Sequence, residues 1–300
     1  MPRRTVVAIG TFDGVHLGHR AILDRVGEVA SPEDLRVVFA FEHPPRLILS
    51  NDPSTGLLLP VDLRRDLLQA AAHRVVLAPF AEMRELAPKA FARHHLVDAL
   101  HASAVVVGEG FRFGRDRTGD VAVLENLGKD LGFSVHPVPA VLIGGEPVSS
   151  TRIRSLLRSG CVREAAALLG RPPVLIGRVV EDGQAGERIE SLEIDPLVLV
   201  PADGVYLVGT FVGAAPAHGL LYVGTASSRE MGERRIELRL LESPSRSLRG
   251  TSIEVQLLER LRDHFTSGGP EADLDLSDRD IETAVSRIER HPHPFEPIRG

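Results

Sequence analysis

The most informative segment of the chain is Gly10-Thr-Phe-Asp-Gly-Val-His-Leu-Gly-His19. It directly follows the apolar run 5–9, which is typical of a buried β-strand, and it leads into the helical pattern of residues 20–29. A glycine-rich turn between a strand and a helix lies at the carboxyl edge of a parallel sheet, where α/β proteins bind ligands. The sequence therefore predicts a ligand site at this turn.

Two histidines and three glycines give the turn its chemistry. His16 and His19 are three positions apart at a helix start, so both rings can face one side, beside amide N–H groups that attract phosphate. Gly10, Gly14 and Gly18 leave room for the backbone to approach a ligand. Two imidazoles with a helix N-terminus can neutralise a phosphate chain without a lysine. A zinc site is rejected, because no third ligand and no i+4 spacing accompany the pair.

The composition excludes several classes of protein. A length of 300 residues predicts two domains. The net charge of −6 gives no overall basic field, so we expect no nucleic-acid partner. Cys161 is the only cysteine, which excludes a disulfide framework and favours a reducing cytoplasm. No stretch approaches the roughly 20 apolar residues of a membrane span, so we expect a cytoplasmic protein without a membrane partner.

The hydrophobic pattern changes near Pro172. Before it, β-branched runs alternate with helical patterns, which is typical of an α/β fold with a parallel sheet. After it, short alternating runs separated by turn residues predict a small antiparallel β-barrel, closed by a C-terminal helix over 278–290. The runs are residues 5–9, 36–41, 74–77 and 104–107, and then 175–180, 197–200, 205–212, 220–223, 235–241 and 252–258. We predict a Rossmann-like domain over 1–172, a barrel domain over 173–290 and a loose tail over 291–300.

A second segment also has residues suited to phosphate. Ser149, Ser150 and Thr151 match the N-cap and first turn of a helix, and Arg152 and Arg154 add positive charge there. Arginine suits this task, because its planar fork matches phosphate. Taken alone, the segment is equally consistent with a capped surface helix.

The third segment, Gly108-Glu-Gly-Phe-Arg-Phe-Gly114, is rich in glycine and follows the run 104–107. Its spacing differs from the dinucleotide fingerprint, and no acidic residue ends a second strand at the required distance, so a Rossmann oxidoreductase is disfavoured. Core packing is the commoner fate of aromatic residues such as Phe111 and Phe113. A flavin contact by Phe111 is the minority hypothesis.

Taken in order, the three segments resemble the nucleotidyltransferase superfamily with its H-x-G-H signature. The Gly-x-Phe-Asp-Gly version of the first is similar to the FMN adenylyltransferase module of bacterial FAD synthetase. Residues 107–114 and 148–154 are similar to later motifs of that module, and the resemblance covers roughly residues 5–172. It implies transfer of AMP from ATP to FMN, with Mg²⁺ and without a covalent enzyme intermediate.

The resemblance also implies roles for individual residues. His16, His19 and Arg154 would be catalytic, stabilising charge across the triphosphate. The nucleotide and the flavin would contact Gly10, Phe12, Asp13, Gly14, Gly18, Gly108, Phe111, Ser149, Ser150 and Thr151. Asp13 is an expected organiser of the loop or of a metal, and no metal ligand is assigned. Gly110 departs from the family, which usually has Asp or Asn there, so we expect weakened or altered flavin binding.

The second half is similar to the riboflavin kinase module of the bifunctional enzyme. The family's Gly-Phe-Pro-Thr-Ala-Asn segment, whose Thr and Asn hold Mg²⁺ and ATP phosphate, should fall near residues 186–194, where the sequence is Gly-Glu-Arg-Ile-Glu-Ser-Leu-Glu-Ile. Phosphoryl transfer depends on a positioned metal. We therefore expect a degenerate kinase. Glu237 matches the position of the kinase's base, but here we expect it to be an ordinary glutamate of a barrel strand.

The main hypothesis is an FMN adenylyltransferase whose kinase domain has lost its activity. One alternative is a fully bifunctional riboflavin kinase/FAD synthetase. Others are a non-catalytic flavin- or nucleotide-binding protein, and a nucleotidyltransferase with another acceptor, as in cytidylyl- or pantetheine-phosphate transferases. The sequence leaves open whether the protein forms a homo-oligomer.

Overall fold

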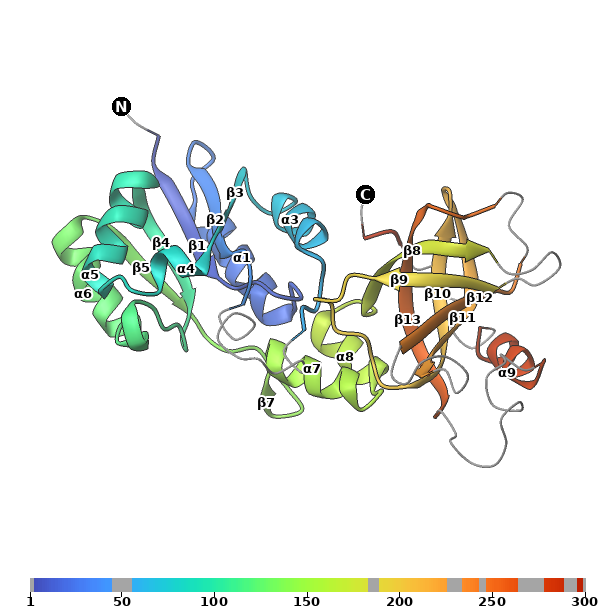
Figure 1. Ribbon diagram of the computed structural model, residues 1–300. Coiled ribbons are helices and arrows are strands. Elements are labelled where there is room, and N and C mark those ends of the chain that lie inside the picture. The colour runs from blue at the N-terminus through green and yellow to red at the C-terminus, as the bar shows by residue number, and fades with distance from the viewer. Residues whose placement is uncertain are drawn as a thin grey trace. The chain divides into compact units, whose positions relative to one another are not determined.

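The computed structural model describes residues 3–44, 56–182, 189–225, 234–242, 247–263, 278–288 and 296–298. The chain divides into two compact units, residues 1–150 and residues 151–298 (Figure 1). The sequence places a domain boundary near Pro172, whereas compactness groups the helices after residue 150 with the barrel. The expected limits 1–172 and 173–290 stay predictions.

The first unit contains a five-stranded sheet in the order β3-β2-β1-β4-β5. Every neighbouring pair is parallel, and β1 lies at the centre. The strands are β1 (Thr5–Gly10), β2 (Leu35–Phe41), β3 (Arg74–Ala78), β4 (Ala102–Gly108) and β5 (Ser134–Val138). Residues on both faces of β1 are buried, as a sheet covered by helices on both sides requires. The α/β prediction for this half is confirmed.

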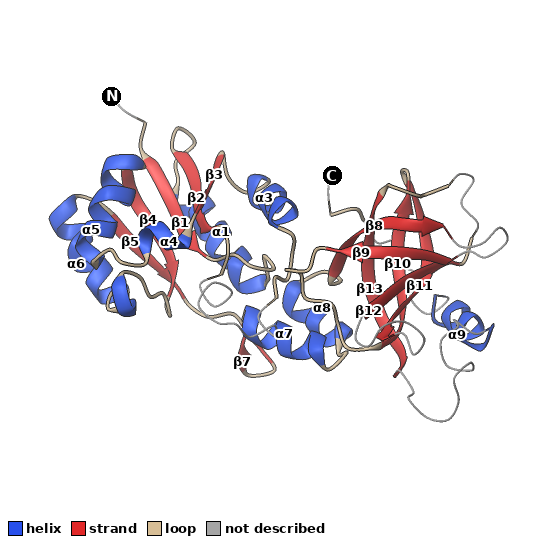
Figure 2. Ribbon diagram, in the orientation of Figure 1, coloured by secondary structure: helices blue, strands red, loops and turns tan. Residues whose placement is uncertain are grey.

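Helices cover both faces of this sheet, with α1 and α3 on one side and α5 and α6 on the other (Figure 2). The helices are α1 (Leu17–Val29), α3 (Val61–Gln69), α4 (Phe80–Met83), α5 (Pro88–Phe91), the π-helix η2 (Ala92–Ala99), the 3-10 helix η3 (Arg115–Arg117) and α6 (Val121–Leu131). A short hairpin, β6 (Leu142–Ile143) with β7 (Glu146–Pro147), follows β5.

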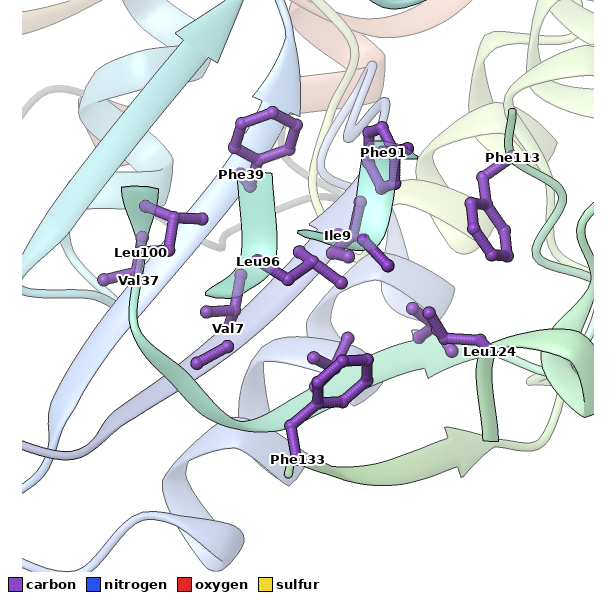
Figure 3. Close-up of a cluster of buried hydrophobic side chains, with 14 of the residues drawn as sticks. Val7, Ile9, Val37, Phe39, Phe91, Leu96, Leu100, Phe113, Leu124 and Phe133 are labelled. Carbon is purple, nitrogen blue, oxygen red and sulfur yellow. The ribbon is translucent and has the colours of Figure 1, made fainter. Parts of the chain in front are cut away.

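One hydrophobic cluster fixes the sheet against α5, η2 and α6 (Figure 3). Val7 and Ile9 of β1 and Phe39 of β2 point into it, because alternate residues of a strand share a face. Phe91 and Leu96 enter from the helical side. This packing holds the strands rigidly, so that the loops at their carboxyl ends are presented from a fixed frame.

The second unit contains α7 (Ser150–Arg158) from its second residue onward, then α8 (Val162–Leu169) and a closed antiparallel barrel, β10-β11-β12-β9-β8-β13. Its strands are β8 (Val174–Asp182), β9 (Ile189–Ile194), β10 (Gly204–Val212), β11 (Ala215–Thr225), β12 (Arg234–Leu240) and β13 (Ser252–Asp263). The helix α9 (Asp278–Ile288) packs on the barrel through Ala284, against Val205 and Tyr222. The predicted barrel with a C-terminal helix is confirmed.

Two details differ from the predicted elements. The run 197–200 is not a strand: Leu197 lies in a turn and Val198 forms only an isolated bridge, whereas the strand just before it in the barrel is the more polar β9. In the predicted tail, the Ile298 N–H donates to the Glu254 carboxylate at 3.1 and 3.3 Å, so residues 296–298 contact the barrel. The tail residues 291–295, 299 and 300 lie outside the described residues.

Candidate active site

The turn between β1 and α1 has an unusual backbone. Phe12 and Val15 have positive φ angles of 50° and 41°, and Gly14 has 85°. A non-glycine residue in a sparsely populated conformation costs on the order of 1–3 kcal/mol and persists only where its surroundings hold it. The contacts around this turn must therefore compensate for the strain.

Asp13 provides two of these contacts. Its buried carboxylate accepts the Leu58 N–H at 3.0 Å (Oδ1) and 3.3 Å (Oδ2). Its backbone carbonyl accepts the Ser150 hydroxyl at 2.9 Å. Asp13 thus ties the turn both to the segment before α3 and to the start of α7. A direct contact of Asp13 with nucleotide or metal stays a prediction.

The two histidines lie together at the start of α1. His16 is the N-cap residue, and its Nδ1 accepts the backbone N–H of His19 at 3.3 Å. Their rings stack with centroids 3.6 Å apart and planes 17° apart. Both side chains are buried, at 5% and 9% exposure. The spacing predicted that the rings share one side, and the structure brings them into contact.

The glycines of the turn make space for these rings. A Cβ at Gly18 would lie 3.2 Å from Cε1 and 3.3 Å from Nδ1 of His16. A Cβ at Gly10 would lie 3.0 Å from the Phe12 ring. The Phe12 ring, fully buried, in turn contacts the His19 ring at a centroid distance of 5.2 Å. Gly18 and Gly10 are therefore needed where the site's own side chains come closest to the backbone.

Burial lowers the pKa of His19 well below its usual value of 6.5, and the nearby His16 and Arg64 lower that pKa further. His19 is therefore neutral at neutral pH. Within the described part of the chain its Nδ1 is buried and has no hydrogen-bond partner. A neutral imidazole beside a helix N-terminus can hydrogen-bond a phosphate oxygen through whichever nitrogen carries the proton.

The serine segment is divided between the two units. Ser150 reaches the turn through its hydrogen bond to Asp13, and the carbonyl oxygen of Val148 lies 3.5 Å from the position of a Cβ on Gly18. Thr151 and Arg154 continue α7 in the second unit, where Arg154 is buried. The structure thus brings Ser150 to the turn. A shared site of Arg154 and the two histidines stays a prediction.

The third segment lies at the end of β4, which pairs with β1, so Gly108 is at the same sheet edge as the turn. The rings of Phe111 and Phe113 stack 5.5 Å apart, with planes at 12°. Phe113 is buried in the core cluster and Phe111 is partly buried against it, in keeping with core packing as the commoner fate of such residues. A Cβ at Gly110 would meet nothing within 4 Å.

Arg64 is not among the site residues predicted from the sequence. This residue lies on α3, is completely buried, and donates from Nη1 to the Thr11 carbonyl at 3.1 Å and from Nη2 to the Glu42 carbonyl. Its position four residues before Leu68, on the buried face of α3, was the available signal. Its partners are distant in the sequence, so no local pattern points to them.

The barrel buries the glutamate singled out from the sequence. Glu237 of β12 is 3% exposed and is ion-paired with Arg235. In the register of the barrel it lies opposite Tyr222 on one side and Ser191 on the other. The segment expected to carry the kinase motif therefore runs, as β9, directly beside Glu237, while residues 183–188 lie outside the described residues.

Among the described residues, no group of three or more His, Cys, Asp or Glu side chains could hold a metal ion. Mg²⁺ in nucleotide-dependent enzymes is held largely by substrate phosphates and water, with one or two carboxylates. The chain therefore offers no closed metal cage in the described part. None of the described helices has the length and apolar character that a membrane span needs.

Comparison with known proteins covers both units. The family model of FAD synthetases matches residues 1–152, and that of riboflavin kinases matches residues 169–287. A bifunctional riboflavin kinase/FMN adenylyltransferase of Escherichia coli is 31% identical over 264 residues, covering 86% of this chain and 84% of the relative. A protein of Listeria monocytogenes named FAD synthetase is 30% identical over 239 residues, covering 79% of this chain and 94% of the relative.

Among solved structures, a protein of Streptococcus pneumoniae described as a macrolide-efflux protein is similar, with a TM-score of 0.80 at 26% identity, covering 99% of this chain and 96% of that chain. The FAD synthetase match over residues 1–152 agrees with the order of the three motifs. The riboflavin kinase match over the barrel does not support the expected loss of kinase activity.

Proposed function

Because the chain belongs to the family of bifunctional riboflavin kinases/FMN adenylyltransferases, we propose that its first half, residues 1–172, transfers AMP from ATP to FMN. The products are FAD and pyrophosphate. The observation that carries this proposal is the stacked, buried pair of His16 and His19 at the start of α1, at the carboxyl edge of the parallel sheet. Charge on phosphate is stabilised best where donors are already oriented and water is excluded.

In the proposed reaction an oxygen of the FMN phosphate attacks the α-phosphorus of ATP in line. The new P–O bond forms as the bond to the β-phosphate breaks, and the electron pair leaves with pyrophosphate. Neutral His19 donates a hydrogen bond to the charge that builds on the phosphates, and the N-terminus of α1 attracts the same charge. Ser150, Thr151 and Arg154 are proposed to hold the phosphates from α7, with Arg154 on the leaving pyrophosphate.

Gly10, Gly14 and Gly18 are proposed to let backbone amides approach the nucleotide. Gly108 and Phe111 are proposed contacts at the neighbouring strand end, where they share the sheet edge with the turn. Mg²⁺, bound with ATP, supplies further neutralisation of the triphosphate. Substrate orientation and charge stabilisation account for the catalysis, since no covalent intermediate is required.

The test is to incubate the purified full chain with ATP, Mg²⁺ and FMN and to identify the flavins by chromatography. We expect FAD and pyrophosphate in equal amounts. Absence of FAD, with tight binding of FMN or ATP, would instead support a binding protein. A product formed only with CTP or another phosphate acceptor would support an altered nucleotidyltransferase.

Riboflavin kinase activity of the barrel is the second candidate function. It is favoured by the kinase family match and by the buried Glu237, which lies beside β9 in the barrel. Burial among barrel strands gives this carboxylate a fixed place from which to accept a proton from a substrate hydroxyl. The motif expected near residues 186–194 differs from the family's, so another arrangement of residues must seat the metal if the activity is present.

A second incubation, with riboflavin in place of FMN, tests this candidate. FMN or FAD formed from riboflavin by the wild-type chain, but not by Glu237→Gln, would support it. The same variant is expected to keep FAD formation from FMN, which serves as the control for folding. Riboflavin that stays unchanged with the wild-type chain would favour a monofunctional adenylyltransferase.

A further inference from the structure

Arg64 is the largest side chain that is completely buried among the described residues. Removing a charged guanidinium from water is costly unless its hydrogen-bonding groups find partners. Within the described part of the chain its Nε has none. The fold therefore keeps a buried charge with incomplete hydrogen bonding, which is unusual for a position that only fills space.

The partners of Arg64 lie at the ends of two neighbouring strands. Thr11 directly follows β1, and Glu42 directly follows β2; the two strands are parallel, with Gly10 opposite Ala40. The guanidinium donates to the carbonyl of each, at 3.1 Å to Thr11. A planar fork with several donors can bridge two acceptors at once, which a lysine ammonium on its single carbon stem does less rigidly.

This bridge acts on the strained part of the active-site turn. Thr11 immediately precedes Phe12, whose φ is 50°, and the turn then leads to His16 at the N-cap of α1. The carboxylate of Asp13 accepts the Leu58 N–H at 3.0 Å. Burial lowers the pKa of Arg64, and the negative charge of Asp13 opposes that shift, so the two side chains also act on one another. Arg64 and Asp13 thus hold consecutive parts of one turn, and Phe12 between them carries the ring that contacts His19.

We propose that Arg64 is a positioning residue for adenylyl transfer: by joining the carboxyl ends of β1 and β2, it holds the turn that places His16 and His19. The inference rests on the proposed function of the first unit. Arg64 does not touch substrate, since no part of its side chain is exposed.

The charge of Arg64 gives the proposal an independent readout. The titratable and charged groups that act on His19 are His16, from the turn, and Arg64, from α3. Both lower the pKa of His19, in addition to the larger effect of burial. Removing the Arg64 charge should raise the pKa of His19, and a lysine at this position, which keeps the charge, should lower it again. A loosening of the core that exposes His19 would raise this pKa in both variants, because burial is the larger cause of the shift.

The experiment compares three variants of the full chain. Arg64→Met removes the charge and both hydrogen bonds, Arg64→Lys keeps the charge but not the fork, and Arg65→Met is the matched control. Arg65 is the next residue on α3, is exposed, and pairs only with Asp62 of the same helix at 3.1 Å among the ion pairs described. The readouts are kcat and KM for FAD formation and the pKa of His19, followed by NMR.

For Arg64→Met we expect kcat to fall on the order of 10²-fold, the effect of misplacing catalytic groups by about 1 Å, with a smaller change in KM for ATP. The pKa of His19 should rise. Arg64→Lys should restore that pKa while restoring only part of kcat, and Arg65→Met should match the wild type in both.

Wild-type kcat in a folded Arg64→Met variant would overturn the proposal. If that variant does not fold, Arg64→Lys decides, because wild-type kcat there would show that the two-carbonyl bridge is not needed. A wild-type chain that makes no FAD would refute the proposed function instead. The pKa of His19 would still report whether Arg64 acts on the histidine, so the two failures can be distinguished.

Discussion

The lowered pKa of His19 affects both its proposed role and the stability of the first unit. Its burial disfavours protonation and keeps the imidazole neutral. A neutral imidazole can still donate one hydrogen bond to phosphate. In the unfolded chain the same side chain regains its usual pKa of 6.5. The folded and unfolded states therefore bind different numbers of protons at acidic pH.

The consequence is a predicted loss of stability in acid. As the pH falls through 6.5, the unfolded chain takes up a proton at His19 before the folded chain does, so the free energy of unfolding falls. The contribution is fully present above pH 6.5 and diminishes below it. We expect His19→Gln to lose less Tm than the wild type between about pH 8 and about pH 5, the range in which histidines titrate. Equal losses in thermal melts of the two proteins would contradict this account.

Gly110 allows a second prediction at the residue scale. A side chain there meets no neighbouring atom within 4 Å, and the backbone is not in the left-handed region. Asparagine, one of the residues usual in the family, should therefore fit without strain. If the side chain contacts the flavin as the family resemblance implies, Gly110→Asn will lower KM for FMN by about tenfold, the effect of one good hydrogen bond. Gly27→Asn, at another glycine with nothing within 4 Å and without a positive φ, is the control. An unchanged KM would show that position 110 does not contribute to flavin binding.

At the scale of elements, the glycines of α1 are subject both to helix propensity and to the packing of the proposed active site. Alanine is a better helix former than glycine by about 1 kcal/mol, so helix propensity alone favours replacing both glycines of α1. A methyl group at Gly18, however, would press on the His16 ring. The same methyl group would also lie 3.5 Å from the carbonyl oxygen of Val148. At Gly27 a methyl group meets nothing within 4 Å.

We therefore predict opposite outcomes for two alanine variants of one helix. Gly27→Ala should raise Tm and leave kcat unchanged. Gly18→Ala should displace the His16 ring from the stack and lower kcat by about tenfold or more, without unfolding the protein. The checks are thermal melts and steady-state FAD formation. Similar kcat values for the two variants would mean that the stack of His16 and His19 tolerates displacement.

Elements with clear periodicity were predictable from the sequence, and those defined by tertiary contacts were not. β1, β2 and β4 are apolar runs flanked by turns, and the structure has them close to their predicted places. β9 alternates charged and apolar residues and escaped notice, because its pairing with β12 and β8 supplies what its composition does not. The run 197–200 is apolar but is not a strand, since the Asp195 carboxylate accepts the Leu197 N–H and the chain turns there.

The same distinction explains which site residues could be predicted. His16 and His19 are close in the sequence, so their spacing at a helix start already implied their contact. Arg64 joins Thr11 and Glu42, which are 53 and 22 positions away, and a buried arginine on an amphipathic helix is normally interpreted as exposed. Only the packing of the strand ends shows its place.

At the scale of the whole molecule, one chain joins a region that matches the FAD synthetase family model and a region that matches the riboflavin kinase family model. Hydrogen bonds join the α7–α8 segment to the barrel domain. The Ala202 N–H donates to the Leu157 carbonyl at 3.0 Å, and Arg260 Nη1 donates to the Ser159 carbonyl at 3.3 Å. The same segment begins with the Ser-Ser-Thr motif that the family resemblance assigns to adenylyl transfer. Thr151 and Arg154, which the proposed function uses, therefore fold together with the barrel.

The most direct measurement of the central claim is kcat for FAD formation from FMN and ATP by His19→Ala, beside His94→Ala and the wild type. His94 is an exposed histidine on η2, paired with Asp98 of the same helix, so its loss controls for a general effect of removing an imidazole. The account predicts a fall on the order of 10²–10³-fold for His19→Ala, the effect of removing one oriented donor from a charged transition state, and no change for His94→Ala. If folded His19→Ala formed FAD at the wild-type rate, the β1–α1 turn would not be where AMP is transferred.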